Sequence, residues 1–281
     1  MRRKNSWSIF SFFNILFDSR YLVFQLTKRE IMGRYKGSAL GILWSLIVPL
    51  FMLALYTYVF SIIFQAKWHP SNSSATPDLS TDKFYFALVL FAGLIIFNIF
   101  SEITLKSSNL IVSNPNFVKK ILFPIELLPL PAIGAASFHL VISLLVLLVF
   151  SFITGHQVPM TFLLIPLIIL PLLFFCLGLC WIFSAIGVYF RDIQQIVGLT
   201  VSVLMFVTPV FYSLSAVPGR FHEIVELNPL THFIEWARQV LILGETPTLI
   251  SYSLGFIGCF LFAWIGFIVF QMSKDGFADV I

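Results

Sequence analysis

Charged side chains are scarce in this sequence. Only 11% of its 281 residues are Asp, Glu, Lys or Arg, whereas 59% are hydrophobic, and the mean hydropathy is +0.96. Soluble domains carry about 25% charged residues and cannot hide this much apolar surface from water. The composition therefore excludes an ordinary soluble domain and indicates an integral membrane protein.

Several signatures of chemistry are also missing. The sequence holds no G-x-x-x-x-G-K-[ST] motif, so the chain does not hydrolyse ATP through a P-loop of its own. A membrane-embedded enzyme would need convergent acids, a nucleophile with its base, or metal ligands, and the charge-free stretches offer none. Cys176 and Cys180 are one turn apart, but no His or carboxylate lies near them in sequence. We interpret them as apolar packing residues and expect no metal site.

A buried relay for ions is missing too. Ion-coupled carriers usually keep a charged or titratable group inside the membrane. Here Glu102 and Glu126 lie near the ends of their charge-free stretches, and His139 is the only titratable side chain well inside one. A lone His on a helix is more often a packing or hydrogen-bonding residue, so the pattern disfavours ion-coupled transport.

What the sequence does contain is long apolar runs. Five stretches without charged residues are long enough to cross a membrane, and turn residues at 154–159 divide the longest one. The runs are continuous, whereas membrane strands alternate over about ten residues, so helices are favoured over a barrel. We predict an all-α polytopic membrane protein with six spans, at about 38–65, 84–105, 130–153, 161–188, 196–212 and 249–272.

The placement of Lys and Arg predicts the orientation. Thirteen of the 17 basic residues fall on one side of the six-span topology and four on the other. Cytoplasmic loops carry the excess of Lys and Arg, so we expect both termini in the cytoplasm. The net charge of +4 then reflects topology and indicates no nucleic-acid partner. The expected organisation is a cytoplasmic N-terminal segment 1–36, a six-span domain 37–273 and a cytoplasmic tail 274–281.

The segment before the first span combines apolar and basic residues. Residues 21–32 supply both, which is typical of a helix lying in the headgroup layer. A simple topology anchor would explain the charge but not the apolar surface. Arg34, Tyr35 and Lys36 follow, and then the charge stops. We expect the chain to turn upright into the membrane at Gly37.

The cytoplasmic return after the second span is longer than a plain connector needs to be. Asn114 can cap a helix that Pro115 begins, and Lys119 and Lys120 would lie in its last turn, where the helix dipole favours positive charge. We predict a short helix over 115–122 that contacts another protein.

Two amphipathic pieces, 221–227 and 229–243, lie between the fifth and sixth predicted spans, on the external side. In the second piece Glu235 and Arg238 are three residues apart and therefore share one helical face.

Aromatic side chains are abundant, with 33 Phe, 8 Tyr and 6 Trp. In the first span Trp44, Phe51 and Tyr58 recur every seven residues, and Tyr56 and Phe60 lie on another face. Such rings pack well against lipid and protein, and that alternative stays open for each. The flat faces of sugar rings also stack on aromatics, so a conduit lined in this way could let a carbohydrate chain slide. The candidate conduit residues, including polar ones of the fifth span, are Trp44, Phe51, Tyr56, Tyr58, Phe60, Gln195, Ser202 and Tyr212.

Four stretches of the chain together resemble a known family. They are LTKREIMGRYKGSALGILWSLIVPLFMLALYTYVF at 26–60, NPNFVKKILFPIELLPL at 114–130, YFRDIQQIVGLTVSVLMFVTPVFYS at 189–213 and LNPLTHFIEWARQVLILGETP at 227–247. In this order and spacing they are similar to the permeases of ABC type-2 exporters. More narrowly, they resemble the subgroup that exports O-antigen polysaccharide, teichoic acid and polyol-phosphate polymers.

The resemblance implies roles for three segments. Residues 21–32 would be an interface helix along the membrane, and 217–243 would be external gate helices that dip back into it. The helix after the second span would be the coupling helix that sits in a groove of a separate ATPase. The residues implied are Asn114, Pro115, Asn116, Phe117, Lys119 and Lys120 for coupling, and Asn228, Pro229, Glu235, Trp236 and Arg238 for the gate helices.

The resemblance also implies partners and cargo. Two permeases would work with two ATP-binding subunits, with ATP and Mg on those subunits and no cofactor on this chain. We expect a permease rather than an enzyme, which moves a lipid-linked polysaccharide across a bacterial inner membrane. The cargo's pyrophosphate head group would meet Arg34, Tyr35, Lys36 and Arg191, although positive-inside topology explains these charges equally well. The alternatives are teichoic acid, capsule polymer or a small lipophilic compound as cargo, an ion-coupled carrier, and a membrane-embedded lipid–sugar enzyme.

Overall fold

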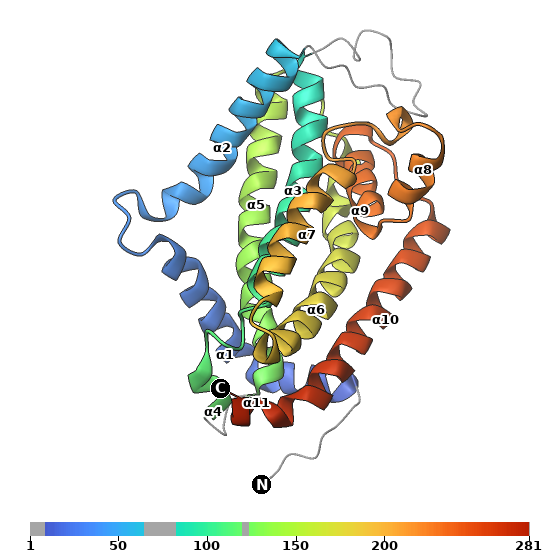
Figure 1. The fold of residues 1–281 in the computed structure, drawn as a ribbon. Helices are drawn as coiled ribbons and strands as arrows, with labels where there is room; N and C mark the ends of the chain where they lie inside the picture. Colours follow the sequence, from blue (N-terminus) through green and yellow to red (C-terminus); the bar gives the residue numbers. More distant parts are fainter. Residues whose placement is uncertain (1–8, 65–82, 120–123, 281) are drawn as a thin grey trace.

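The described chain is helical. The computed structural model describes residues 9–64, 83–119 and 124–280, and within these ranges every regular element is a helix, which confirms the all-α prediction. The long helices form a bundle, and α1 and α2 make an elbow at one side of it (Figure 1). The bounds are α1 Ile9–Tyr35, α2 Trp44–Tyr56, α3 Lys83–Ser107, α4 Pro115–Lys119, α5 Pro129–Ile153, α6 Ile165–Tyr189, α7 Ile193–Val207, α8 Gly219–Glu226, α9 Pro229–Arg238, α10 Leu249–Ser273 and α11 Phe277–Val280.

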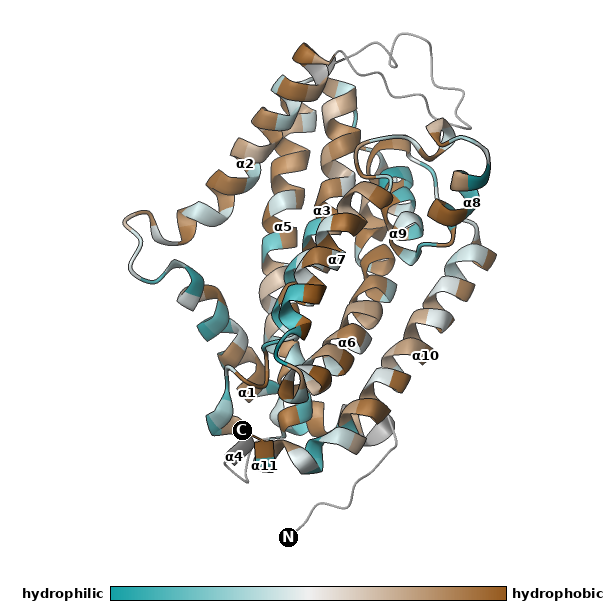
Figure 2. Cartoon of the chain, in the orientation of Figure 1, coloured by the Kyte–Doolittle hydropathy of each residue, from teal (hydrophilic) through white to brown (hydrophobic). Residues whose placement is uncertain are grey.

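Several described helices are long and apolar enough to cross a membrane. Five such segments are found, and they correspond to five of the six predicted spans. Figure 2 shows hydrophobic residues along most of their length, with hydrophilic residues gathered near helix ends and around α8 and α9. The segments are Gly41–Phe60, Phe84–Ser107, Ile125–Ile153, Met160–Tyr189 and Leu249–Gly276.

The predicted fifth span is shorter than expected. Its helix, α7, has 15 residues and ends at Val207. That is about 22 Å of helix, whereas crossing a membrane takes roughly 20 residues. The helix stops because Thr208 is extended and precedes Pro209, a position where helical backbone is disfavoured. The count of six spans stays a prediction. The described chain begins and ends at the same end of the bundle, as an even number of crossings requires (Figure 1).

The centre of the bundle is α3. It contacts α5, α6, α7 and α9, and every residue from 85 to 97 is buried. A helix that is hydrophobic all round belongs in such a place. Within lipid the hydrophobic effect does not drive helices together, so α3 is held by close packing and by the polar contacts described below.

One end of the bundle is crossed by α1. The ring of Phe12, near the start of this helix, lies 5.1 Å from Trp181 of α6 and 5.6 Å from Phe267 of α10, both edge to face. The last turn of the helix reaches α3 and α5. The predicted interface helix 21–32 is thus only the middle of a longer helix, because the apolar residues before it also pack on the bundle.

A sharp elbow joins α1 to α2. Gly37 and Gly41 have φ angles of +87° and +53°, in the left-handed region that glycine adopts most readily. A Cβ at either position would meet no atom within 4 Å, so backbone conformation, not crowding, requires glycine there. The turn predicted at Gly37 is confirmed.

The C-terminal tail is folded against the bundle. After a turn at Lys274–Gly276, α11 contacts α4 and α6. Phe277 is buried, with its ring 5.4 Å from that of Phe270 and 6.1 Å from that of Tyr189.

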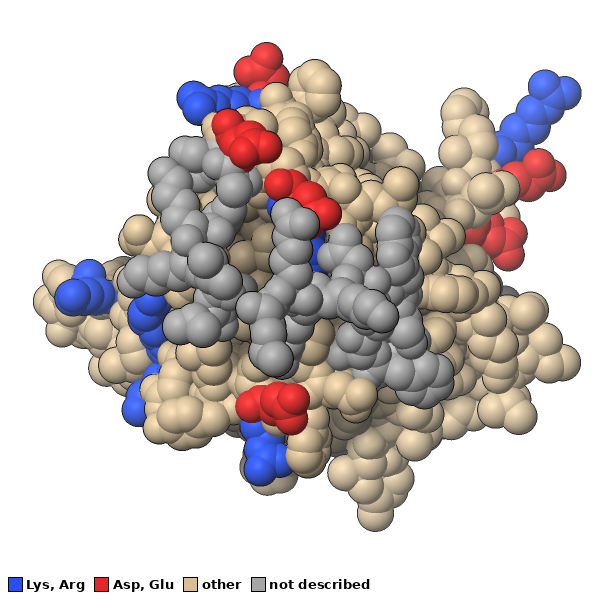
Figure 3. Space-filling view, turned by 90° about the horizontal axis from the view of Figure 1, so that it is seen from below, with Lys and Arg blue, Asp and Glu red and all other residues tan. Residues whose placement is uncertain are grey.

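Figure 3 shows the molecule from below. Acidic and basic side chains are interspersed around this face, and most of the visible surface belongs to uncharged residues or to residues that are not described.

Candidate functional site

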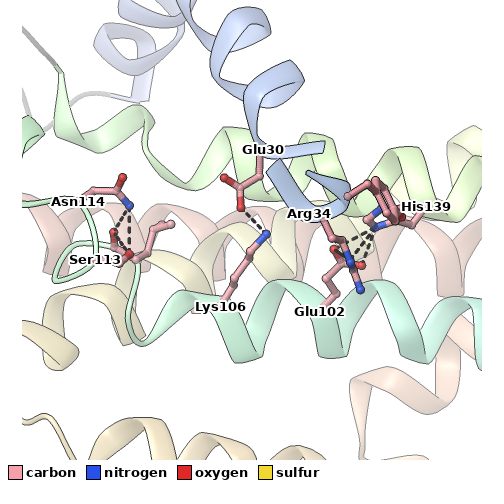
Figure 4. Close-up of polar contacts among 9 residues, drawn as sticks. Glu30, Arg34, Glu102, Lys106, Ser113, Asn114 and His139 are labelled. Carbon is pink, nitrogen blue, oxygen red and sulfur yellow. Dashed lines mark hydrogen bonds and ion pairs between the residues drawn. The ribbon is translucent and has the colours of Figure 1, made fainter. Parts of the chain in front are cut away.

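A polar cluster joins the end of α1 to α3 and α5 (Figure 4). Arg34 Nη1 lies 2.7 Å from Glu102 Oε1, and Lys106 Nζ lies 2.5 Å from Glu30 Oε1. His139 Nδ1 lies 3.0 Å from both carboxylate oxygens of Glu102, and its Nε2 lies 3.0 Å from the hydroxyl of Tyr35. We call Glu30, Arg34, Tyr35, Glu102, Lys106 and His139 the junction cluster.

The partners of His139 decide which tautomer fits. A ring that carries a proton on Nδ1 donates to Glu102 and accepts at Nε2 from the Tyr35 hydroxyl. Arg34 Nη1 lies 3.1 Å from the same Nδ1, but in this tautomer it donates only to Glu102 Oε1. Burial raises the pKa of Tyr35 above its ordinary value of 10.0, Glu102 adds to that rise and Arg34 opposes it, so the phenol keeps the proton that it donates. Apart from the imidazole, the cluster holds two cationic side chains, Arg34 and Lys106, and two acidic ones, Glu30 and Glu102.

Only part of the junction cluster was predicted from the sequence. Arg34 and Tyr35 were predicted to face a head group, and the structure brings both of them to His139 and Glu102. His139 is not a lone histidine, because its partners lie 37 and 104 positions away. The available signal was the matched spacing of opposite charges, four residues apart, in Glu30–Arg34 and in Glu102–Lys106.

The other two predicted head-group residues lie elsewhere. Lys36 is exposed at the start of the elbow, and Arg191 is exposed in the turn between α6 and α7. Arg34 keeps about half of its side chain exposed (53%), so part of its guanidinium is open to a ligand despite the bond to Glu102.

A helix, α4, lies where the coupling helix was predicted, and Pro115 begins it as expected. Its coupling role stays a prediction. The Asn114 side chain turns backward, because its amide nitrogen donates to the carbonyl oxygen of Leu110 at 2.9 Å, while its backbone carbonyl accepts from Phe117 N. The guanidinium of Arg29 lies 5.7 Å from the ring centre of Phe117, so α4 is held against α1. Asn116 is exposed. Lys119 is the last residue of α4, and Lys120 with the rest of 120–122 lies outside the described residues.

The residues predicted for the gate helices gather around α9. Asn228 Oδ1 accepts from the backbone N–H of Leu230 at 3.1 Å, which caps the helix, and Pro229 occupies its first position. The amide nitrogen of Asn228 donates to Thr208 Oγ1 at 2.9 Å. The start of α9 is thereby tied to the end of α7.

Arg238, which the sequence places among the basic residues of the external side, is not a surface charge. It is buried, with 2% exposed, and donates to the carbonyl oxygens of Val89, Pro209 and Val210 at 3.2, 2.7 and 2.7 Å. It also pairs with Glu235 at 2.8 Å, as their shared helical face predicts. Arg238 is buried because the backbone carbonyl oxygens of Pro209 and Val210, which follow α7, accept no helical hydrogen bond and need another donor.

Trp236, the remaining predicted gate residue, is also buried. Its ring lies 5.9 Å from that of Tyr252 on α10, and Gly255 leaves room for it. The helix α9 therefore packs into the bundle against α3 and α6, and against α10 through Trp236, and presents little of its apolar face to the outside.

The predicted conduit residues divide into two groups. Trp44, Phe51 and Tyr58 are exposed, as are Gln195 and Ser202 of α7. The other group packs within the chain. Phe60 stacks on Phe211 with ring centres 5.6 Å apart, Tyr56 lies 6.3 Å from the same ring, and the Tyr212 hydroxyl caps α7 by donating to the carbonyl oxygens of Phe206 and Val207.

The cysteines lie in packed positions. Cys176 and Cys180 of α6 and Cys259 of α10 are free and buried. Among the described residues, no three His, Cys, Asp or Glu side chains come together in a way that could hold a metal ion.

Known proteins resemble this chain over nearly its whole length. The sequence profile of the family described as ABC-2 type transporter matches residues 21–242, from within α1 to the end of the turn after α9. The chain is 26% identical to the O-antigen export system permease protein RfbA of Klebsiella pneumoniae over 95% of this chain and 96% of that protein. It is 26% identical to the protein of the same name from Myxococcus xanthus, over 95% and 97%. It is 25% identical to the polysialic acid transport protein KpsM of Escherichia coli, over 88% and 91%.

Proposed function

The chain belongs to the ABC-2 type transporter family, and we propose that it is the membrane permease of an ATP-driven exporter of a lipid-linked, O-antigen-like polysaccharide. The observation that carries this proposal is the end-to-end similarity to relatives named as permeases for O-antigen export and as a polysialic acid transport protein. The cargo would pass from the cytoplasmic to the outer face of a bacterial inner membrane. The permease itself would perform no bond chemistry.

In this proposal two copies of the chain work with two ATP-binding subunits, which hold ATP and Mg. Exposed aromatic and polar side chains of the first span (Gly41–Phe60) and of α7 would face the second copy and line the conduit between them, with Phe51, Tyr58 and Ser202 in contact with the cargo. The outer side of α7 supports this role, because Leu199 and Phe206 are exposed beside Ser202 although they are apolar.

The end of the bundle that carries α4 would face the cytoplasm. The excess of Lys and Arg on the predicted cytoplasmic side supports this orientation, and with α7 as a sixth, short span both termini would lie there. Segment 1–36 then lies at the inner membrane surface, 37–273 forms the permease domain and 274–281 contacts its base. ATP-driven movement would reach the permease through Asn116 and Phe117 of α4.

The exposed cations near this end could receive the cargo's pyrophosphate. Lys36 and Arg191 are exposed, and Arg34 is open in part. Among other cargoes, teichoic acid or capsule polymer would use the same contacts, since they share a charged head group and a polyol or sugar chain. A small lipophilic compound would make fewer favourable contacts with the polar side chains of α7.

One observation favours a second candidate function. Glu102 and His139 form an ion-pair network on two membrane-crossing helices, and such groups often carry ion-coupled transport. An ion-coupled carrier would keep exporting after ATP depletion as long as an ion gradient persists. An ATP-driven permease would stop at once while the gradient is intact.

The test is affinity purification of this chain from its native membranes in mild detergent, followed by identification and counting of what accompanies it. We expect an ATP-binding subunit in equal number, and ATP-dependent movement of lipid-linked polysaccharide when the complex is placed in vesicles. A chain that comes out alone, and that no added ATP-binding subunit joins, would overturn the ABC assignment of the mechanism and direct attention to the ion-coupled alternative.

A further inference from the structure

Two ion pairs of opposite sense connect α1 to α3. Arg34 of α1 pairs with Glu102 of α3, and Glu30 of α1 pairs with Lys106 of α3 (Figure 4). We propose that this charge pattern sets the register of α1 along α3, so that these four side chains are positioning residues for the elbow and the first span. The proposal goes beyond the export function and does not depend on which cargo is carried.

The spacing of the charges matches one helical turn on both helices. Glu30 and Arg34 are four residues apart, as are Glu102 and Lys106, so each pair of charges lies on one face of its helix. The later residue on α1 meets the earlier residue on α3, which means that the two helices run antiparallel at this contact. In this arrangement Glu30 of α1 faces Lys106 of α3, and Arg34 of α1 faces Glu102 of α3.

A slip of one turn in either direction would bring like charges together. If α1 moved so that Glu30 took the place of Arg34, Glu30 would face Glu102. If it moved the other way, Arg34 would take the place of Glu30 and face Lys106. Either slip also breaks both ion pairs. One-turn slips of packed helices do occur in proteins, so excluding them is a real requirement for a helix that must sit in one place.

Repulsion, more than attraction, explains why this pattern is useful. Ion pairs that are partly exposed contribute little net attraction, and Arg34 and Lys106 retain 53% and 38% exposure. Like charges placed opposite each other disfavour the wrong arrangement, which is how charged positions select register and partner at other helix interfaces. The pattern therefore selects one register without binding α1 tightly.

The register decides where the elbow stands. Tyr35 is the last residue of α1 and lies two positions before Gly37, so a one-turn slip would displace the elbow by about 6 Å along α1. The hydrogen-bonding distance between Tyr35 and His139 of α5 exists only in the observed register. The start of α2 is set by the same placement.

A second contact offers a direct readout of register. An ideal Cβ on Gly134 of α5 would lie 3.4 Å from the Cβ of Thr27 on α1, close to the separation of about 3.5–4.5 Å found in disulfides. The variant Thr27→Cys with Gly134→Cys should therefore cross-link in the observed register. Val23→Cys or Ile31→Cys with Gly134→Cys should cross-link only after a one-turn slip in one direction or the other. Because Thr27 Cγ2 would lie 2.7 Å from the new Cβ at position 134, every variant with Gly134→Cys that lacks Thr27→Cys also carries Thr27→Ala, which removes this clash.

The decisive variant is Glu30→Lys combined with Lys106→Glu. It keeps an attractive pair at this position, but it makes both charges on α1 positive and both on α3 negative. A one-turn slip then meets opposite charges, so the attraction survives and the register penalty is gone. Lys106→Arg serves as the matched control because it preserves the sign pattern.

The experiment measures oxidative cross-linking of the full-length protein in native membranes for the three cysteine pairs. Variants with Gly134→Cys as the only new cysteine report any capture by the buried native cysteines. With the natural charges and with Lys106→Arg, we expect the Thr27 pair to form at least tenfold more product than either slipped pair. With the combined reversal we expect a slipped pair to rise to a comparable yield.

Two results would overturn the proposal. One is a combined reversal that cross-links only through the Thr27 pair, as the natural protein does. The other is slipped product already prominent with the natural charges. If the combined reversal does not accumulate in the membrane, Glu30→Lys alone is used. Its new cation is repelled by Lys106 in the observed register and meets Glu102 after a slip in one direction only, so the Val23 pair should rise and the Ile31 pair should not. Cross-linking needs no cargo and no ATPase, so failure here is distinct from failure of the export proposal.

Discussion

The side chain of Arg238 donates from Nε to the carbonyl oxygen of Val89 at 3.2 Å, although the two residues are 149 positions apart. Gly93, one turn along α3, leaves the space that the guanidinium occupies, since a Cβ there would lie 2.8 Å from Arg238 Nη2. The side chain of Arg238 therefore links α9 to the middle of α3 and to the chain that follows α7.

Replacing Arg238 with Met should therefore destabilise the permease strongly. The change leaves Glu235 without its partner and the carbonyl oxygens of Pro209 and Val210 without the donor that Arg238 supplies. Breaking a buried charge pair costs about 3–5 kcal/mol, and the part exposure of Glu235 places this change near the lower end. The measurement is the thermal unfolding midpoint of the purified protein in detergent. Arg220→Met on α8, where the side chain is exposed, is the control and should shift the midpoint little. Equal midpoints for the two variants would contradict the role given to Arg238.

Gly187 should not tolerate a side chain. A Cβ at this position of α6 would overlap the carbonyl oxygen of Ser108, in the turn that leads from α3 towards α4. Gly187→Ala should therefore push α6 and this turn apart, lower the unfolding midpoint and weaken the coupling of ATP hydrolysis to export. Gly258→Ala on α10 is the matched control, because no atom lies within 4 Å of its new Cβ. There the helix should gain up to about 1 kcal/mol.

Asn116 offers a way to test the coupling helix without disturbing the bundle. Its side chain is exposed on α4, so Asn116→Arg should leave membrane insertion intact while blocking a close-fitting partner surface. We expect at least a tenfold loss of the ATP-binding subunit in co-purification. His222→Arg adds the same side chain on α8, at the opposite end of the molecule, and should keep the partner at its normal yield. Undiminished recovery with Asn116→Arg would remove α4 from the docking surface.

Lys36 and Arg191 test recognition of the cargo's head group. Both are exposed, so replacing both with Gln removes charge without breaking a described contact. Export measured in vesicles should need several times more lipid-linked substrate to reach half of its maximal rate, and added salt should lower the natural protein's rate more than the variant's. Lys28→Gln, an exposed change on α1, is the control. Adding Arg34→Gln completes the set, and unchanged export and insertion in that triple variant would contradict recognition of the head group by these charges.

The aromatic residues of the first span should separate into two classes. Phe51→Ala and Tyr58→Ala remove exposed rings, so they should slow export while stability stays within about 0.5 kcal/mol. Phe60→Ala removes a ring that stacks on Phe211 and should cost about 3 kcal/mol of stability. Unfolding midpoints and vesicle export, measured on the same preparations, distinguish the two. Normal export from the first two variants would exclude them from the conduit.

Much of the architecture was predictable because the five helical segments that are long enough to cross a membrane are largely uninterrupted apolar runs. Periodicity and turn residues located the boundary between α5 and α6 and the glycine elbow at Gly37. The helix α4 was predictable in the same local way, from a proline at its first position. The early end of α7 was not found, since the signal for it is a single Thr208-Pro209 step inside an apolar stretch.

The polar contacts were harder to predict because they join distant positions. The sequence places Glu102, His139 and Arg34 on three separate elements, and no local pattern indicates that they touch. Burial of Arg238 was missed for a similar reason. Its partners are mainly backbone carbonyl oxygens, and these exist at every residue, so they leave no mark on the sequence.

The buried Phe277 and the contact between α11 and α4 have a consequence for how the protein is made. The residues of α4 emerge from the ribosome long before those of α11. The neighbourhood of α4 is therefore complete only after α11 has been synthesised. A chain truncated at Ser273 would present α4 without this neighbour, so the base of the bundle distinguishes a chain that includes α11 from one that stops before it.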